Sequence, residues 1–437
     1  MLKSWRALTL WKRVFIGLAL GVLVGLGLHY GLGAEKGADI AEAWFQPFGQ
    51  AFVNLIKMLV VPLIATTLVS GVVAMGDPKR LGSLGIRTIG MYLMTTFFAV
   101  WLGLLVGTIF QPGAGMGEVV MGAQASVDTV TDKLSAAGSA KKGFADYLVG
   151  IIPTNPISAL ANGDVLGIIV FSIFVGVGIL LVGEKAKPVA DFFDAASEVV
   201  MKITMLIMDL APYGVLALMA WVMGVNGLGI LASMGKLAVA LYLACILQII
   251  LIYGGLIIRV ILKLPFGRFI YGIADAIGVA YSTASSNATL PVTISCAEHN
   301  LGVDKSVAGS VLPMGATINM DGTAIYLGIV ALFAAQALGI DMTAGQYVMV
   351  ALTATLTSIG AAGIPSAGLL LAASVLSVIG VTDVQSTLII AFIFPFDRLL
   401  DMMRTVTNVS GDVAVACTVA KFEGELDEEV FRAKPVH

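Results

Sequence analysis

The sequence predicts an all-α polytopic membrane protein. Of its 437 residues, 58% are hydrophobic and only 12% are charged, and the mean hydropathy is +0.96. A soluble domain has about 25% charged residues, so the ionic side chains here are too few to cover a globule of this size. The composition therefore excludes a soluble enzyme. The net charge of −3 also offers no basic excess for binding nucleic acid.

Eight segments are apolar enough to be transmembrane helices, since a spanning helix needs about 20 mostly apolar residues. They are residues 14–33, 45–75, 85–111, 146–183, 195–224, 229–262, 303–338 and 384–420. The first could also be a signal peptide, but its apolar core is long and no clear cleavage motif follows it. We therefore expect it to be a retained helix.

The charges of the loops predict the orientation. Lys and Arg precede the first segment and recur at residues 77–87 and 259–268, whereas residues 35–42 are net acidic. Because positive charge marks cytoplasmic loops, we expect a cytoplasmic N-terminus, and an even number of spans returns the C-terminus to that side. Residues 422–437 are polar and mixed in charge, and are expected to form a solvated cytoplasmic tail.

Two regions interrupt the helical pattern. Residues 266–298 contain a polar run at 281–291, and residues 344–380 contain a Gly- and Pro-rich run at 357–368. Each is predicted to be a re-entrant helical hairpin with a non-helical tip, because such backbone is tolerated at membrane depth only inside protein or beside water. A pair of interrupted segments indicates the binding site of a transporter. Two ordinary helices with kinks are the alternative.

The last apolar segment carries polar residues in steps of four, three, four and four, at Asp397, Asp401, Arg404, Asn408 and Asp412. This spacing places them on one face of a helix. A charge at the bilayer centre costs about 2.5–3.5 kcal/mol, so we expect this face to point into the protein. An ion-pair ladder between helices is one interpretation. The surplus of Asp over Arg favours a polar pathway that binds a cation.

The segment before the second hairpin carries Asn319, Asp321 and Thr323 beside Gly315 and Gly322. Glycine weakens a helix and frees backbone carbonyls, and oxygen ligands suit a hard cation such as Na⁺. A packed polar cluster is the alternative. Weaker signals in the third segment are Tyr92, Thr95 and Thr96. The cysteines and histidines are too scattered for a zinc or redox site.

Four motifs in the C-terminal half resemble those of the dicarboxylate/amino acid:cation symporter family, which includes the glutamate and aspartate transporters. They are Ser-Ser-Asn-Ala-Thr-Leu-Pro-Val at 285–292, Asn-Met-Asp-Gly-Thr at 319–323, Ser-Ile-Gly-Ala-Ala-Gly-Ile-Pro at 358–365 and Asp-Met-Met-Arg-Thr-Val-Thr-Asn-Val-Ser-Gly-Asp at 401–412. The order and spacing of the four motifs make the resemblance specific.

The resemblance implies a fold of eight transmembrane helices plus two re-entrant hairpins, of the glutamate-transporter-like elevator type. It implies a homotrimer in the lipid bilayer, in which a transport domain moves against a static scaffold and the second hairpin is the extracellular gate. The scaffold would comprise residues 1–80 and 113–224, including an extracellular loop. The transport domain would comprise residues 81–112 and 225–421, followed by the tail at 422–437.

Substrate contacts are also implied by the resemblance. Arg404 matches the arginine that pairs with the side-chain carboxylate of the substrate, as suits a guanidinium fork. Asp401 matches the carboxylate that holds the substrate α-amino group. Further contacts match Thr405, Asn408, Thr323, Ser285, Ser286, Ile364 and Gly368.

Three sodium sites are implied in the same way. One would use Gly315, Asn319, Asn408 and Asp412. A second would use the carbonyls of Thr317, Ser358, Ile359 and Ala361. A third would use Tyr92, Thr95, Thr96, Asn319 and Asp321.

Departures from the family pattern refine the expected substrate and coupling. Members that move C4-dicarboxylates lack the aspartate at Asp401, and neutral amino-acid members replace Arg404, so both residues favour an acidic amino acid. Leu327 stands where mammalian members carry a titrating glutamate, which disfavours proton cotransport. Relatives place an extra arginine near Asp401, but here those positions are Ala284 and Met402. Arg398 is then the candidate substitute.

The leading hypothesis is a sodium-coupled symporter for L-aspartate and L-glutamate in a prokaryotic inner membrane. A proton-coupled glutamate or C4-dicarboxylate symporter is the alternative within the same class. An intramembrane aspartyl protease could pair Asp321 with Asp401, but it would need neither Arg404 on the same face nor two hairpins. An enzyme and a pure ion channel are therefore disfavoured.

Overall fold

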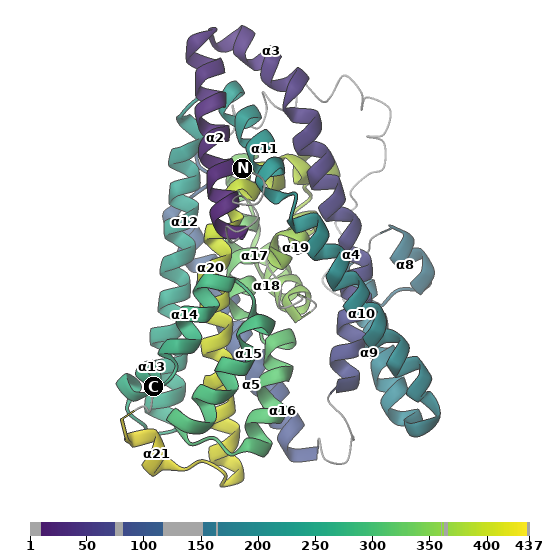
Figure 1. Ribbon diagram of the computed structural model, residues 1–437, viewed down its shortest axis with the longest axis vertical. Coiled ribbons are helices and arrows are strands. Elements are labelled where there is room, and N and C mark those ends of the chain that lie inside the picture. Colours follow the sequence, from purple (N-terminus) through teal and green to yellow (C-terminus); the bar gives the residue numbers. More distant parts are fainter. Residues whose placement is uncertain are drawn as a thin grey trace, which may run out of the picture.

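The computed structural model describes residues 10–74, 82–116, 152–162, 165–359, 361 and 366–434. Within these ranges the chain is helical, with no strand and one isolated bridge between Val303 and Leu426. In the same ranges, 5 helical stretches are long and apolar enough to cross a membrane. The prediction of a polytopic, all-helical protein agrees with this architecture (Figure 1).

The N-terminal helices pack against a helix from the middle of the chain. α2 (Leu10–Gly31) is followed by α3 (Ala34–Trp44) and α4 (Gln46–Ala74), and α2 lies along α11 (Ala211–Asn226). Glycine makes this approach possible, because a Cβ at Gly17 would lie 2.2 Å from the carbonyl oxygen of Pro212. Gly21 and Gly25 meet α11 in the same way one and two turns later, so small residues form the seam, as is common between membrane helices.

The next helices divide one predicted segment. α5 (Gly82–Phe110) packs along α17, and α8 (Pro156–Asn162) leads to α9 (Val165–Val182) and a short 3₁₀ turn, η1 (Gly183–Ala186). The expectation of one continuous helix over 195–224 is wrong. Within this range α10 (Lys187–Met208) ends at Met208 and α11 begins at Ala211, because Pro212 favours the first turn of a new helix.

The first interrupted region forms a helical hairpin. α12 (Gly229–Leu247) runs straight into the π-helical η2 (Gln248–Ile261) before this hairpin begins. Hairpin 1 comprises α13 (Phe266–Gly272), α14 (Ala274–Thr283), α15 (Ser286–Ser295) and η3 (Cys296–Asn300). Its tip falls inside the polar run predicted to break the helix. Ala284 has a left-handed φ of 50°, and Ser285 caps α15 by accepting from the Ala288 amide at 3.2 Å.

The second half repeats this pattern of breaks. α16 (Lys305–Ile318) and α17 (Asp321–Ala337) are separated at Asn319 and Met320, where the sequence predicted a weakened helix. Hairpin 2 comprises α18 (Ala344–Ile359) and α19 (Ala367–Val378), which pack together. Residues 360 and 362–365 of its tip lie outside the described residues.

α20 (Asp383–Glu423) is the longest helix and lies at the centre of the C-terminal half, in contact with both hairpins (Figure 1). A capping box at Thr382 and Gln385 begins it. The tail expected to be solvated from residue 422 is exposed at most of its described residues, but one segment of it docks on the bundle. α21 (Glu428–Arg432) packs against α13 and η3, and Phe431 is completely buried, so an apolar anchor docks this segment.

Candidate substrate and cation sites

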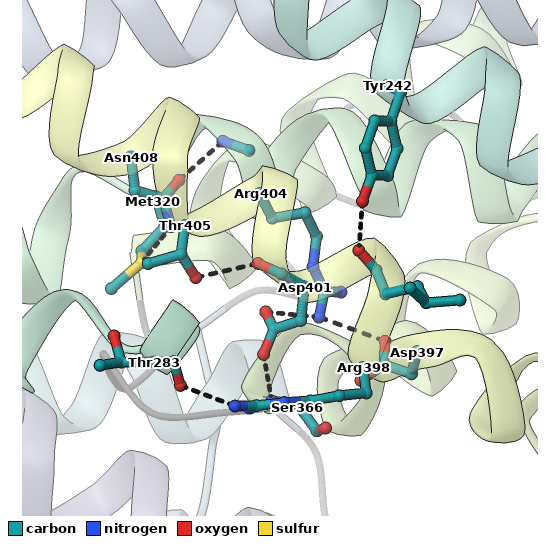
Figure 2. A network of polar contacts seen from close by, with 12 residues as sticks. Tyr242, Thr283, Met320, Ser366, Asp397, Arg398, Asp401, Arg404, Thr405 and Asn408 are labelled. Atoms are coloured by element: carbon teal, nitrogen blue, oxygen red, sulfur yellow. Dashed lines mark hydrogen bonds and ion pairs between the residues drawn. The ribbon is translucent and has the colours of Figure 1, made fainter. Parts of the chain in front are cut away.

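A buried cluster of charges lies in the middle of α20. The Arg404 guanidinium is completely enclosed, and its Nη2 lies 2.7 Å from Asp401 Oδ1 and 3.1 Å from Asp397 Oδ1 (Figure 2). Two carboxylates thus surround one arginine on consecutive turns, as the spacing of the polar face predicts. In the described part of the chain, Arg404 Nε and Nη1 have no hydrogen-bond partner. This buried guanidinium therefore keeps two nitrogens, with three N–H donors between them, that an anion could engage.

The surroundings of Arg404 fix the orientation of the guanidinium plane. Its Cζ lies 4.1 Å from the centre of the Tyr326 ring, a cation–π contact from α17. Gly368 is also close to the guanidinium, because an added Cβ there would lie 2.8 Å from Arg404 Nη1 and 3.0 Å from Thr323 Cγ2. The structure thus brings Arg404, Thr323 and Gly368 together, and a larger residue at 368 would fill the space beside the guanidinium.

Both hairpin tips contact the same turn of α20. The Ser366 amide, at the tip of hairpin 2, donates to Asp401 Oδ2 at 2.7 Å. Arg398 Nη2 donates to the Thr283 carbonyl oxygen, at the tip of hairpin 1, at 2.9 Å. Figure 2 shows these two bonds approaching the helix from the same side. The side chains of α20 thus bridge two segments that lie far apart in the sequence.

The other predicted substrate residues lie around this cluster with different partners. The Thr405 hydroxyl donates to the Asp401 carbonyl oxygen of its own helix at 2.9 Å, and Asn408 Oδ1 accepts from the Gly322 amide at 2.7 Å. Ser285 and Ser286 are buried at the start of α15. Ile364 lies outside the described residues.

Asp321 is the centre of a second polar cluster. Its Oδ1 accepts from the Thr96 hydroxyl at 2.6 Å, and its Oδ2 accepts from the Tyr253 hydroxyl at 2.6 Å. The side chains come from α17, α5 and η2, so three helices converge on one fully buried carboxylate. Gln248 Nε2 reaches the same Oδ2 at 3.4 Å.

Asp412 and Asn319 form a third cluster next to the second. Asn319 Nδ2 donates to Asp412 Oδ1 at 2.9 Å, and the Thr95 hydroxyl donates to Asn319 Oδ1 at 3.2 Å. A Cβ at Gly315 would lie 2.5 Å from Asp412 Oδ1 and 2.7 Å from the Tyr92 hydroxyl oxygen. Two buried carboxylates with amide, hydroxyl and carbonyl oxygens around them are donors of the kind that hard cations take.

Three of the four predicted carbonyl ligands lie in two helices that contact each other. Thr317 lies in the last turn of α16, while Ser358 and Ile359 end α18. The Ala361 amide donates to the Ser358 carbonyl oxygen at 3.0 Å. Ala361 itself lies two residues beyond the end of α18.

Comparison of the sequence with known proteins indicates the function of these clusters. Residues 10–422 match the model of the sodium:dicarboxylate symporter family. The chain is 36% identical over 413 residues to a proton/sodium-glutamate symport protein of Bacillus subtilis (strain 168), covering 94% of this chain and 92% of that protein. It is 34% identical over 427 residues to a C4-dicarboxylate transport protein of Anaeromyxobacter sp. (strain K), covering 98% of this chain and 92% of that protein.

The chain belongs to the sodium:dicarboxylate symporter family. It is therefore a multi-pass membrane transporter that takes a small-molecule substrate, and not an enzyme. The resemblance inferred from the four motifs is confirmed, and the interpretation of Asp321 and Asp401 as a protease pair is excluded.

Sequence reasoning missed three side chains that the structure adds to these clusters. Tyr253 and Gln248 donate to Asp321, and Tyr326 lies on the Arg404 guanidinium. Gln248 was the detectable signal, as a polar residue within an otherwise apolar run. Tyr253 lies five residues later, and only the π-helical winding of η2 brings both to the same carboxylate.

Proposed function

We propose that this symporter imports the acidic amino acids L-aspartate and L-glutamate together with Na⁺. The observation that carries the proposal is the buried Arg404 guanidinium, which has two nitrogens without partners among the described residues and a carboxylate, Asp401, beside it. A cation next to an anion fits a substrate with a side-chain carboxylate and an α-amino group. A C4-dicarboxylate would leave Asp401 facing a second negative charge.

Each substrate group then has a residue to bind it. Arg404 pairs with the side-chain carboxylate, and Asp401 accepts from the α-amino group. Thr405 and Asn408 on α20, Thr323 on α17, and the backbone near Ser285, Ser286, Ile364 and Gly368 surround the rest of the molecule. Because Ser366 at hairpin 2 donates to Asp401, closure of this hairpin and binding of the amino group involve the same carboxylate.

The cation sites follow from the oxygen clusters. Asp412 with Gly315, Asn319 and Asn408 forms one Na⁺ site. The carbonyls of Thr317, Ser358, Ile359 and Ala361 form a second, and Asp321 with Tyr92, Thr95, Thr96 and Asn319 forms a third. Support comes from the convergence on two fully buried carboxylates, whose isolated negative charges are unfavourable away from water. Cation binding would neutralise them and order the hairpin backbone that completes the substrate site.

The domain organisation is part of the same proposal. The transport domain comprises residues 81–112 and 225–421 and moves as an elevator against a scaffold of residues 1–80 and 113–224, within a homotrimer whose termini are cytoplasmic. Both hairpins contact α20, and these contacts support this division.

Uptake into proteoliposomes tests the proposal. Labelled L-aspartate is offered with an inward sodium gradient at equal pH, and then with an inward proton gradient without sodium. Uptake driven by sodium alone supports the proposal. Uptake driven by protons alone would retain the Arg404 site and overturn the three sodium sites.

The alternative is a proton-coupled glutamate or C4-dicarboxylate symporter. It is favoured by the two relatives, one a proton/sodium-glutamate symport protein and the other a C4-dicarboxylate transport protein. Proton coupling at position 327 is disfavoured, because Leu327 is a fully buried apolar side chain that cannot bind a proton. Succinate uptake that exceeds aspartate uptake would favour the alternative substrate.

A further inference from the structure

Arg398 is a buried arginine that the proposed substrate and cation sites leave without a role. Only 7% of its surface is exposed, and it follows Asp397 directly on α20. In the described part of the chain its only hydrogen bond goes from Nη2 to the Thr283 carbonyl oxygen, and Nε and Nη1 have no partner. A buried charge with so few partners is unfavourable, so its retention here needs a reason.

The hydrogen bond from Arg398 to Thr283 gives the first reason for a buried arginine at this position. Thr283 is the last residue of α14, and the next residue, Ala284, has a left-handed φ of 50°. This conformation is disfavoured for a residue with a Cβ and persists only where neighbours hold it. Arg398 fixes the peptide that leads into it, and thereby the cap at Ser285 that begins α15.

Hairpin 2 is held in a parallel way. Ser366 at its tip also has a left-handed conformation, with a φ of 63°, and its amide is held by Asp401. Two residues three positions apart on α20 thus each hold one strained hairpin tip, one through a carbonyl oxygen and the other through an amide (Figure 2).

Charge supplies the second reason. The cluster contains two carboxylates, Asp397 and Asp401, and Arg404 alone would leave it with a net charge of −1. Arg398 follows Asp397 directly and precedes Asp401 by three positions on α20, so its charge lies within one helical turn of both carboxylates. With Arg398 the cluster is neutral, which favours the entry of an anion.

We propose that Arg398 is a positioning residue of the substrate site, which holds the tip of hairpin 1 on α20 and neutralises the carboxylate cluster that receives the anionic substrate. The charge part of this inference rests on the proposed function. The hairpin part stands on the bond to Thr283 and is tested without substrate.

Three variants are compared in two assays, one assay for each part. R398Q removes the charge and has a side chain too short to reach the Thr283 carbonyl oxygen, and R398K keeps the charge and a longer donor. R259Q is the matched control, because Arg259 is an exposed arginine on η2. Expression, detergent extraction and size-exclusion profiles are compared first, so that an unfolded variant is recognised.

The hairpin part is read by hydrogen exchange of peptides that cover residues 279–290. In R398Q these amides are expected to exchange about tenfold faster, because the strained tip loses its anchor. R398K is expected to restore slow exchange, and R259Q to match the wild type. Equal exchange in R398Q and R259Q would overturn the role in positioning.

The charge part is read by competition of L-aspartate and succinate against labelled L-aspartate. A lost positive charge acts once on the monoanion and twice on the dianion, so R398Q should weaken aspartate about threefold and succinate about tenfold. R398K should keep the wild-type ratio. Equal weakening of both anions would overturn the charge role. If the wild type binds neither anion, the proposed function fails, and the exchange measurement still decides the role of Arg398 at the hairpin.

Discussion

Arg404 donates from Nη2 to Asp401 Oδ1 at 2.7 Å across one turn of α20, with both side chains buried. The second oxygen of this carboxylate accepts from the Ser366 amide. Asp401 therefore connects the guanidinium to hairpin 2. Under the proposed function, a substrate amino group bound to Asp401 would share this carboxylate with the tip of hairpin 2.

Replacing Arg404 with cysteine is expected to abolish uptake of acidic amino acids. The change leaves Asp397 and Asp401 buried without their cationic partner, and truncating one member of such a pair costs about 2–5 kcal/mol. Uptake of L-aspartate in proteoliposomes should fall at least about 30-fold, with some uptake of neutral amino acids gained. An R404C variant with wild-type affinity for aspartate would show that Arg404 does not bind the substrate.

Replacing Asp401 with asparagine is expected to alter which anion is preferred. Asparagine has one oxygen where aspartate has two, so it can accept from Arg404 or from Ser366 but not from both as Asp401 does, and it cannot pair with a charged amino group. A charge-assisted bond contributes about 1.5–3 kcal/mol, so the affinity for L-aspartate should fall at least about tenfold relative to succinate, which has no amino group. Competition assays measure both constants. An unchanged ratio would mean that the amino group binds elsewhere.

The spacing of polar residues made the central cluster predictable. Any helix over this segment places five polar residues on one face, namely Asp397, Asp401, Arg404, Asn408 and Asp412. The break at Asn319 follows from the glycine and polar residues around it. These features are local, and local periodicity is what a sequence displays.

Contacts between distant segments could not be predicted in this way. The bond from Tyr253 to Asp321 depends on π-helical winding, and the docking of Phe431 depends on a site formed by other helices. The division between α10 and α11 was missed because hydropathy stays high through Leu210, while Pro212 restarts the helix. Tertiary packing and backbone geometry decided these points, and hydropathy does not report either.

Replacing Asp412 with asparagine is expected to weaken sodium dependence without changing the substrate. The variant keeps an oxygen acceptor for Asn319 but removes the negative charge that attracts a cation. The sodium concentration for half-maximal uptake should rise about tenfold, while the order of preferred substrates stays the same. A sodium titration that coincides with the wild type would remove Asp412 from the cation ligands.

Tyr253 tests whether the hydroxyl groups around Asp321 matter for cation binding. Tyr253→Phe removes one hydrogen bond to the carboxylate and keeps the ring, which should shift the sodium titration by about threefold to tenfold. Tyr242→Phe is the control, because its hydroxyl donates to the Leu399 carbonyl oxygen rather than to a carboxylate. Equal shifts in both variants would indicate a general packing effect.

The docked C-terminal segment gives a prediction about stability and pH. Phe431 is buried, so Phe431→Ala should release α21, since such truncations cost about 3–5 kcal/mol. Hydrogen exchange over residues 424–432 should then become fast, while exchange in α20 stays slow.

Hydrogen bonds from Lys421 and then Arg432 hold the pKa of Glu428 below its ordinary value. A lowered pKa stabilises docking above the ordinary value of 4.5, and this contribution is lost as the pH falls through the folded-state pKa. Exchange of residues 424–432 should therefore be constant between about pH 6 and 8, after correction for the intrinsic rate, and rise below about pH 4.5. Glu428→Gln should remove that acid-induced rise and leave the effect of Phe431→Ala intact. If Glu428→Gln retains the full rise, another group anchors the segment.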